Sequence, residues 1–314
     1  MSGNFIGLLM FAALMGFLVY RVHIGIAMFI VGAGGYLAMY EGNWSPLINS
    51  LKNLAFARFS NYDLAVIPLF ILMGQFATNG GLSRALFQCV NNFVGHWRGG
   101  VAMAAVGACG AFGAICGSSL ATAATMGQVA LPELKRFRYS GALSTGALAA
   151  GGTLGILIPP SVPLVIYAVL TQESMGKLFM AAVVPGVIAL IGYMLVIRIV
   201  VTLNPEAGPA GPKVALDERL RSLVNVAPVI FVFLVVIVGI YAGWANPTEA
   251  ASIGVGACGI LAILNGMRKD GVVRSLLGTA EATAMIFLVL LGADMLNAGL
   301  ALSQLPAELA VELQ

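Results

Sequence analysis

The sequence carries very little charge. Asp, Glu, Lys and Arg make up 9% of its 314 residues, whereas a soluble globular domain carries roughly 25%. Hydrophobic residues make up 60% of the chain, so the composition excludes both an ordinary soluble fold and a disordered chain. The formal net charge is only +3 and no basic tract occurs, which gives no indication of nucleic-acid binding. The composition predicts an all-α polytopic membrane protein.

Residues that usually perform catalysis or bind transition metals are also scarce. The only histidines, His23 and His96, have no ligand spacing, and the four cysteines form no CxxC pair. The sequence contains no GxSxG elbow and no phosphate-binding loop. We therefore expect no enzyme and no resident cofactor, and an ion gradient rather than ATP would drive any transport.

Intervals without charge predict the membrane-spanning helices, because a helix that crosses about 30 Å of hydrocarbon needs about 20 apolar residues. Single crossings are expected at 1–20, 22–40, 64–83, 178–197, 222–248, 250–267 and about 277–300. The last requires Glu281 and Asp294 to be accommodated. An intramembrane carboxylate indicates function by default, and for Asp294 a structural role near the outer interface is the alternative.

The interval Gly99–Pro132 is too long for one crossing and too short for two. Arg98 precedes it and a basic cluster at 135–138 follows it, which places both ends on the cytoplasmic side by the positive-inside rule. We therefore predict a re-entrant hairpin with its tip at Gly117-Ser118-Ser119. With the N-terminus outside, this topology leaves only three of the 16 Lys and Arg on the outer side, namely Lys52, Arg58 and Lys177.

The interval Tyr139–Gln172 is expected to cross once with a break inside. Its motif GGTLGILIPPSVP contains Pro159-Pro160, and proline both lacks a backbone donor and clashes with the preceding turn. The carbonyls near residues 155–158 therefore lose their helical partners and become available to a cation.

Small and hydroxylated residues surround the predicted hairpin tip. Glycines at spacings of three, three and four favour close helix packing, and they are Gly107, Gly110, Gly113 and Gly117. Four hydroxyls follow at the turn, from Ser118, Ser119, Thr122 and Thr125. Two interpretations stay open for these hydroxyls: binding of an anion and a hard cation at helix N-termini, or helix capping alone.

Several motifs resemble the large membrane subunit of tripartite ATP-independent periplasmic (TRAP) transporters, the DctM type. They are GAICGSSLATAATMGQVALPELKRFRY, GGTLGILIPPSVPLVIYAV and GKLFMAAVVPG, together with stretches at 65–86 and 246–255. The resemblance implies an inverted-repeat, ion-transporter-like architecture and sodium-coupled secondary transport by an elevator-type motion. It also implies a separate small membrane subunit (DctQ type) and a periplasmic solute-binding protein (DctP type). The binding protein would deliver an organic acid, such as a dicarboxylate or a sialic acid, to the transporter at the bacterial inner membrane.

The same resemblance places a sodium site on this chain. Its implied sodium ligands are Cys116, Gly155, Ile158 and Pro160. The candidate substrate- or ion-binding residues around it are Ser118, Ser119, Gly152, Thr153 and Ser161. Cys116 stands where the family more often has serine. A thiol is a poorer sodium ligand than a hydroxyl, whereas a backbone carbonyl at this position would be unaffected by the change.

Charge pattern and resemblance together divide the chain into five parts. They are N-terminal spans with an interfacial helix (1–98), the hairpin (99–132), a broken helix with the following span (133–202), a cytoplasmic linker (203–223) and an incomplete second repeat (224–314). Family members continue beyond this length with a second hairpin, so we expect a fragment or an early-terminated product. The alternatives to a sodium-driven carrier are a proton-coupled carrier that uses Asp294 and a non-transporting truncated membrane scaffold.

Overall fold

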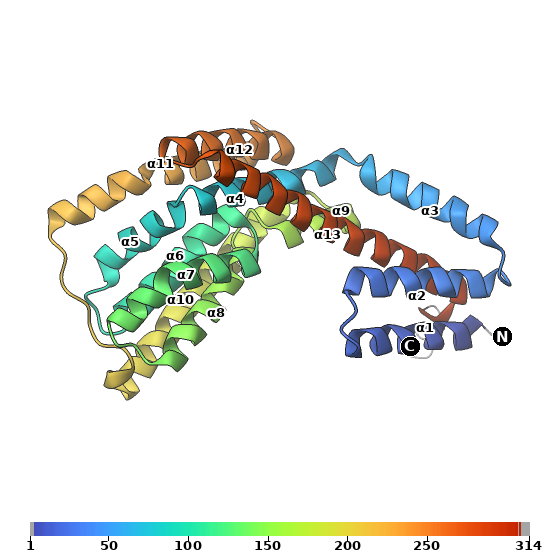
Figure 1. Cartoon of the computed structure of the whole chain (residues 1–314), viewed down its shortest axis with the longest axis horizontal. Helices are drawn as coiled ribbons and strands as arrows, with labels where there is room; N and C mark the ends of the chain where they lie inside the picture. The colour runs from blue at the N-terminus through green and yellow to red at the C-terminus, as the bar shows by residue number, and fades with distance from the viewer. Residues whose placement is uncertain (1–2, 307, 309–314) are drawn as a thin grey trace. The chain divides into compact units, whose positions relative to one another are not determined.

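The computed structural model describes residues 3–306 and 308, and within those ranges it contains only helices and their connections (Figure 1). This confirms the prediction of an all-α polytopic membrane protein. Five helical segments are long and apolar enough to cross a membrane, or six if one bent pair counts as a single span.

The helices of the first 136 residues are α1 (Gly3–Val19), α2 (Ile24–Met39), α3 (Trp44–Phe59), the 3-10 helix η1 (Tyr62–Ala65), α4 (Val66–Asn79), α5 (Leu82–Val94), α6 (Gly100–Cys116) and α7 (Ser119–Arg136). The helices that follow are α8 (Gly141–Leu157), α9 (Val162–Thr171), α10 (Met175–Leu203), the 3-10 helix η2 (Pro205–Ala207), α11 (Leu216–Tyr241), α12 (Pro247–Leu264) and α13 (Lys269–Ser303).

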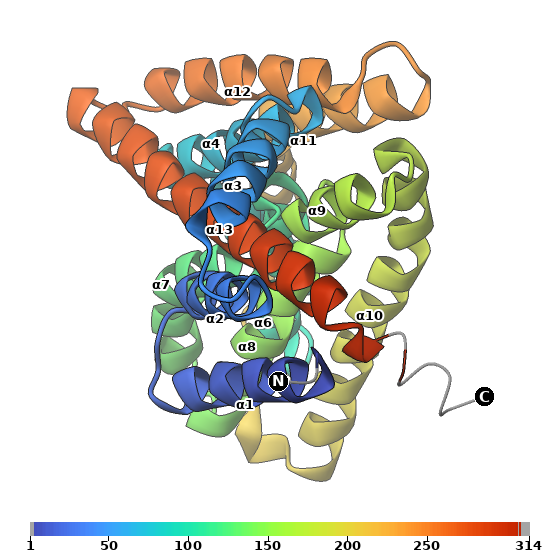
Figure 2. The ribbon, with the colours of Figure 1, turned by 90° about the vertical axis from the view of Figure 1, so that its right-hand side faces the viewer.

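The chain forms two compact units. The first consists of residues 1–62 and 280–314, and the second of residues 63–279. In the first unit α1 lies beside α2 (Figure 2). Its core contains Ile6, Met10 and Val31, against which residues of α13 such as Leu296 pack. Glycine makes this packing close, because a Cβ on Gly32 would lie 2.5 Å from the backbone of α13.

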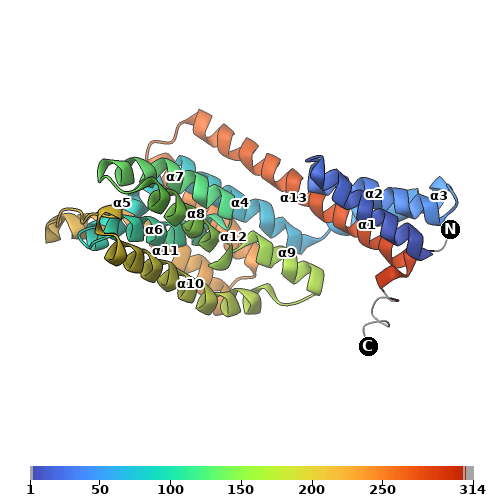
Figure 3. The same ribbon diagram turned by 90° about the horizontal axis from the view of Figure 1, so that it is seen from below.

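The second unit is built around α6, which is buried along almost its whole length and packs against α4, α5, α8 and α10 (Figure 3). Its closest neighbour is α8. A Cβ added at Gly113 would lie 2.5 Å from the Cα of Gly155, so the two backbones touch where glycine faces glycine. This contact supports the packing interpretation of the glycine series, since small residues allow membrane helices to approach closely.

Element boundaries near residues 80 and 216 differ from the sequence-based expectation. The expected crossing at 64–83 is divided, because α4 ends at Asn79 and Gly81 adopts a left-handed φ of +73° before α5 begins. Helix α11 starts at Leu216, inside the predicted linker. Asp217 and Glu218 lie in its first turn, where negatively charged side chains stabilise the helix through its dipole.

The connection 204–215, which contains η2, is tied to the start of α6 rather than free in solvent. The Gly99 N–H donates to the Gly208 carbonyl at 2.9 Å, and the Gly211 N–H donates to the Gly95 carbonyl at 2.9 Å. These main-chain bonds fix the segment to the end of the bundle at which α6 begins.

Candidate functional site

The turn between α6 and α7 falls at the predicted tip. Helix α6 ends at Cys116, Gly117 takes a left-handed φ of +64° and α7 begins at Ser119. Only glycine adopts such a backbone conformation without steric cost. The Ser118 hydroxyl caps α7 by accepting a bond from the Ala121 N–H at 3.4 Å. Helix α7 runs four residues beyond the expected hairpin end, to Arg136. That α6 and α7 enter and leave the membrane on the cytoplasmic side stays a prediction.

The break between α8 and α9 spans residues 158–161. Pro159 and Pro160 have no N–H, so the carbonyls of Gly155 and Ile156 cannot form their helical bonds. The Ser161 hydroxyl donates to the Ile156 carbonyl at 2.7 Å and replaces one of these bonds. The Gly155 carbonyl is left without a helical donor.

The turn and the break meet in space. The Val162 N–H, the first of α9, donates to the Gly117 carbonyl at 3.3 Å. A Cβ on Gly117 would lie 3.0 Å from the Pro160 carbonyl oxygen, and one on Gly155 would lie 2.8 Å from the Ser118 carbonyl oxygen. The C-terminal ends of α6 and α8 and the N-terminal ends of α7 and α9 therefore converge. C-terminal ends carry partial negative charge and N-terminal ends carry partial positive charge.

Thr122 adds a side-chain oxygen at this convergence. The residue is completely buried, and its hydroxyl has no hydrogen-bond partner among the described residues. A Cβ on Gly155 would lie 2.6 Å from this hydroxyl oxygen. The Cys116 thiol lies within reach of the hydroxyl but is a weak hydrogen-bond group, and the pair lacks the geometry of a full hydrogen bond. A buried hydroxyl without a partner costs about 1–3 kcal/mol. A small cation held by oxygen ligands would remove that cost.

Most of the candidate residues named from the sequence lie at this convergence. They are Cys116, Ser118, Ser119, Gly152, Gly155, Ile158, Pro160 and Ser161. The Ile158 side chain itself packs toward Gly110 of α6 and Gly186 of α10. Thr122 is absent from the set implied by the family resemblance. Its only signal in the sequence is its place in the run of hydroxyls after the turn.

Thr153 faces a different neighbour. Its hydroxyl donates to the Ala150 carbonyl at 2.7 Å and lies 3.0 Å from the Tyr193 hydroxyl of α10. One residue along a helix turns the side chain by about 100°, so Thr153 faces α10 whereas Gly152 contacts Ala123 of α7. The structure therefore does not bring the Thr153 hydroxyl to the turn.

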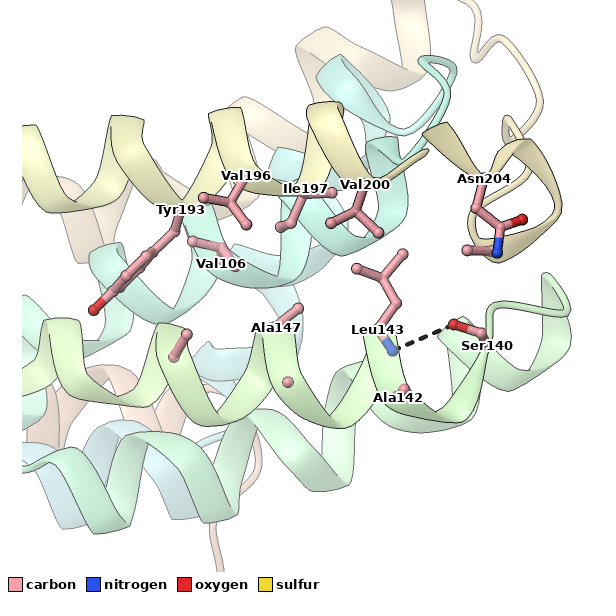
Figure 4. Close-up of a pocket in the computed structure, with 13 residues that line it drawn as sticks. Val106, Ser140, Ala142, Leu143, Ala147, Tyr193, Val196, Ile197, Val200 and Asn204 are labelled. Atoms are coloured by element: carbon pink, nitrogen blue, oxygen red, sulfur yellow. Dashed lines mark hydrogen bonds between the residues drawn. The ribbon is translucent and has the colours of Figure 1, made fainter. Parts of the chain in front are cut away.

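A separate apolar pocket lies between α8 and α10 (Figure 4). Its volume is about 440 Å³. Val196 and Ile197 of α10 face Ala147 of α8, while Ser140 and Asn204 lie at one end. Because the walls are almost entirely hydrocarbon, this pocket provides no set of ligands for an ion.

Asp294 is held in an ion pair within the first unit. The Arg58 guanidinium on α3 donates from Nη2 to Oδ1 of Asp294 at 2.6 Å and from Nε to Oδ2. The two side chains are 18% and 10% exposed. The sequence alone leaves Asp294 between a functional and a structural role and does not predict this partner. A paired, largely buried carboxylate favours the structural role.

The turn and the break bring together uncharged oxygens, which are the type of ligand that a hard cation can use. Among the described residues no group of three His, Cys, Asp or Glu side chains could hold a metal ion. Carbonyl and hydroxyl oxygens bind hard cations rather than soft transition metals. Such a set matches a monovalent cation better than zinc or copper.

Comparison with known proteins agrees with the resemblance seen in the motifs. Residues 11–314 match the family described as tripartite ATP-independent periplasmic transporter, DctM component. A C4-dicarboxylate TRAP transporter large permease protein DctM of Pseudomonas aeruginosa is 38% identical over 83% of this chain and 62% of its own length. A protein of the same description from Vibrio cholerae is 34% identical over 78% of this chain and 53% of its own length.

A sialic acid TRAP transporter large permease protein SiaM, also of Vibrio cholerae, is 29% identical over 84% of this chain and 62% of its own length. The chain therefore spans less than two thirds of each of these three relatives.

Proposed function

This chain belongs to the DctM family of tripartite ATP-independent periplasmic transporters, and from that premise we propose that it serves sodium-coupled secondary transport of an organic acid across the bacterial inner membrane. The names of the relatives give C4-dicarboxylates and a sialic acid as their substrates. A small carboxylate is therefore the substrate class that we propose for this protein.

The observation that carries the sodium proposal is the presence, at one convergence of helix ends, of two oxygens that lack their usual hydrogen-bond donors. The Gly155 carbonyl lacks its helical donor because residue 159 is proline, and the buried Thr122 hydroxyl lacks a hydrogen-bond partner among the described residues. Both belong to the convergence of the α6–α7 turn and the α8–α9 break. Uncharged oxygens that replace a hydration shell are the ligands that alkali cations use inside membranes.

The proposed mechanism is elevator-type. The residues of the candidate site all belong to the compact unit 63–279. A site contained in one unit can move with that unit as a body, which an elevator-type motion requires. In this proposal a periplasmic binding protein of the DctP type delivers the substrate and a small membrane subunit of the DctQ type completes the membrane complex.

The test is uptake by proteoliposomes that contain the chain together with both partner subunits. We expect accumulation of a carboxylate when sodium is the only gradient. Undiminished uptake in sodium-free medium with a pH gradient would show that sodium is not the coupling ion. No accumulation under either gradient would leave the chain as a non-transporting scaffold.

The proton-coupled alternative relies on Asp294. The Arg58 guanidinium donates a hydrogen bond to each oxygen of that carboxylate. A carboxylate whose two oxygens are both held in this way has no oxygen free for a second proton-relay partner, so the geometry does not favour this alternative.

A further inference from the structure

The apolar pocket between α8 and α10 is a slot whose two helices lie close together at one end only (Figure 4). Near the α8–α9 break, a Cβ on Gly186 of α10 would lie 2.9 Å from the Ile158 side chain. Toward the start of α8, a Cβ on Gly146 would meet nothing within 4 Å, and Gly146 lines the slot. The small residues of this part of α8 therefore leave open space opposite α10.

The walls of the slot determine what can fill it. Of the residues that line it, only Ser140, Tyr193 and Asn204 have polar side chains. The Tyr193 hydroxyl already pairs with the Thr153 hydroxyl at 3.0 Å, and the Ser140 hydroxyl accepts from the Leu143 N–H at 3.3 Å. A water molecule needs two to four polar partners, which these walls do not provide. An empty slot would lose the dispersion contacts of its lining atoms, so hydrocarbon is the chemistry that fits.

The slot has the length of one lipid leaflet. Tyr193 and Asn204 line it from α10, and their separation of eleven residues corresponds to about 16 Å along a helix. Half of the hydrocarbon core of a bilayer is about 15 Å thick. Ser140 and Asn204 lie at the same end of the slot, where the Ser140 N–H donates to the Ala207 carbonyl at 3.0 Å. This end follows the basic cluster at 135–138, so the predicted topology places it at the cytoplasmic surface.

Two arginines flank the polar end of the slot. Arg138 precedes Ser140 by two residues, and Arg198 lies on α10 six residues before Asn204. Both arginines are exposed, and neither forms an ion pair within the part of the chain that the structure describes. Basic groups near the cytoplasmic surface attract anionic lipids. A long arginine side chain on a helix can also extend along it to reach the headgroup region.

We propose that the slot binds one acyl chain of an anionic phospholipid of the cytoplasmic leaflet. The chain lies between α8 and α10, and the headgroup phosphate lies near Arg138 and Arg198. The Asn204 amide adds N–H donors for the lipid ester oxygens at the same end. This inference goes beyond the proposed function, because it depends neither on the coupling ion nor on the transported substrate.

The test uses the 314-residue chain in phosphatidylcholine nanodiscs that contain a trace of phosphatidylglycerol with a photoreactive diazirine in one acyl chain. After irradiation, mass spectrometry of peptides locates the lipid adducts, which we expect on the slot-lining residues of α8 and α10. Gly146→Leu should lower this labelling by about tenfold, because its side chain would occupy the slot. Gly256→Leu on α12 is the matched control, since a Cβ there also meets nothing within 4 Å and Gly256 does not line the slot. Its labelling should equal that of the parent chain.

A phosphatidylcholine with the same photoreactive chain tests the headgroup. We expect it to label the slot about fivefold less than phosphatidylglycerol does, and Arg138→Gln should remove part of that difference. Equal labelling by the two lipids would overturn the anionic headgroup, and equal labelling of the parent and Gly146→Leu would overturn the slot as the binding site. Loss of labelling on addition of the small membrane subunit would assign the slot to that protein and also overturn the proposal.

Discussion

The variant Thr122→Val tests whether the Thr122 hydroxyl binds an ion or only fills space in the core. Valine keeps the shape of threonine and removes the Oγ1 atom, which is buried and has no hydrogen-bond partner among the described residues. Without sodium, the variant loses an unsatisfied polar group. Its free energy of unfolding should therefore rise by about 1 kcal/mol.

When sodium is present, the difference in stability between the variant and the parent should change sign. A ligand that binds only the folded state stabilises it by RT ln(1 + [L]/Kd). Loss of one oxygen contact to a charged ion should cost about 1.5–3 kcal/mol of binding free energy, which corresponds to about 10- to 150-fold in sodium concentration. The variant should thus be more stable than the parent in potassium buffer and gain less stability from added sodium.

The assay is thermal unfolding during a sodium titration at constant ionic strength, with potassium as the replacement ion. Thr145→Val on α8 is the matched control, because that hydroxyl is exposed and donates to the Gly141 carbonyl at 2.8 Å. Its sodium titration should match that of the parent. Coincident sodium titrations of the parent and Thr122→Val would refute the assignment of this hydroxyl to the ion site.

Two further predictions concern packing and charge. Gly155→Ala should lower the free energy of unfolding by about 1–3 kcal/mol, because the new Cβ would lie 2.6 Å from the Thr122 hydroxyl. Gly146→Ala on the same helix has nothing within 4 Å and should raise the free energy by up to about 1 kcal/mol, so equal effects in chemical denaturation would contradict the packing account. Arg58→Gln and Asp294→Asn should each cost about 2–4 kcal/mol, since each leaves a partly buried charge unpaired, and the double variant should recover part of that loss. Single variants within 0.5 kcal/mol of the parent in thermal unfolding, about the usual limit for surface substitutions, would show that the pair does not stabilise the fold.

Local chemistry explains what could be predicted from the sequence. Proline lacks an N–H in every context, so the helix break at Pro159-Pro160 can be predicted from these two residues alone. Gly117 supplies the left-handed turn that ends α6. The helical class follows from long apolar intervals, because only helices satisfy every backbone group within a single segment of lipid-exposed chain.

The rest depends on contacts between distant residues. No pattern in the sequence pairs the Val162 N–H with the Gly117 carbonyl, and none pairs Arg58 with Asp294, which lies 236 residues away. The family resemblance places Thr153 with the site, whereas the rotation of the helix directs its hydroxyl toward α10. Proximity in a motif therefore predicted the segment and not the direction of each side chain.

The central claim is that the α6–α7 pair enters and leaves the bilayer on the cytoplasmic face and so carries its turn to the break between α8 and α9. The most direct measurement is the labelling of single cysteines at Arg98→Cys and Lys135→Cys by a membrane-impermeant thiol reagent, since the four native cysteines are buried. Both positions should react only when the reagent is on the cytoplasmic side. Reaction of the two positions from opposite sides would contradict the hairpin and remove the basis for an ion site at its tip.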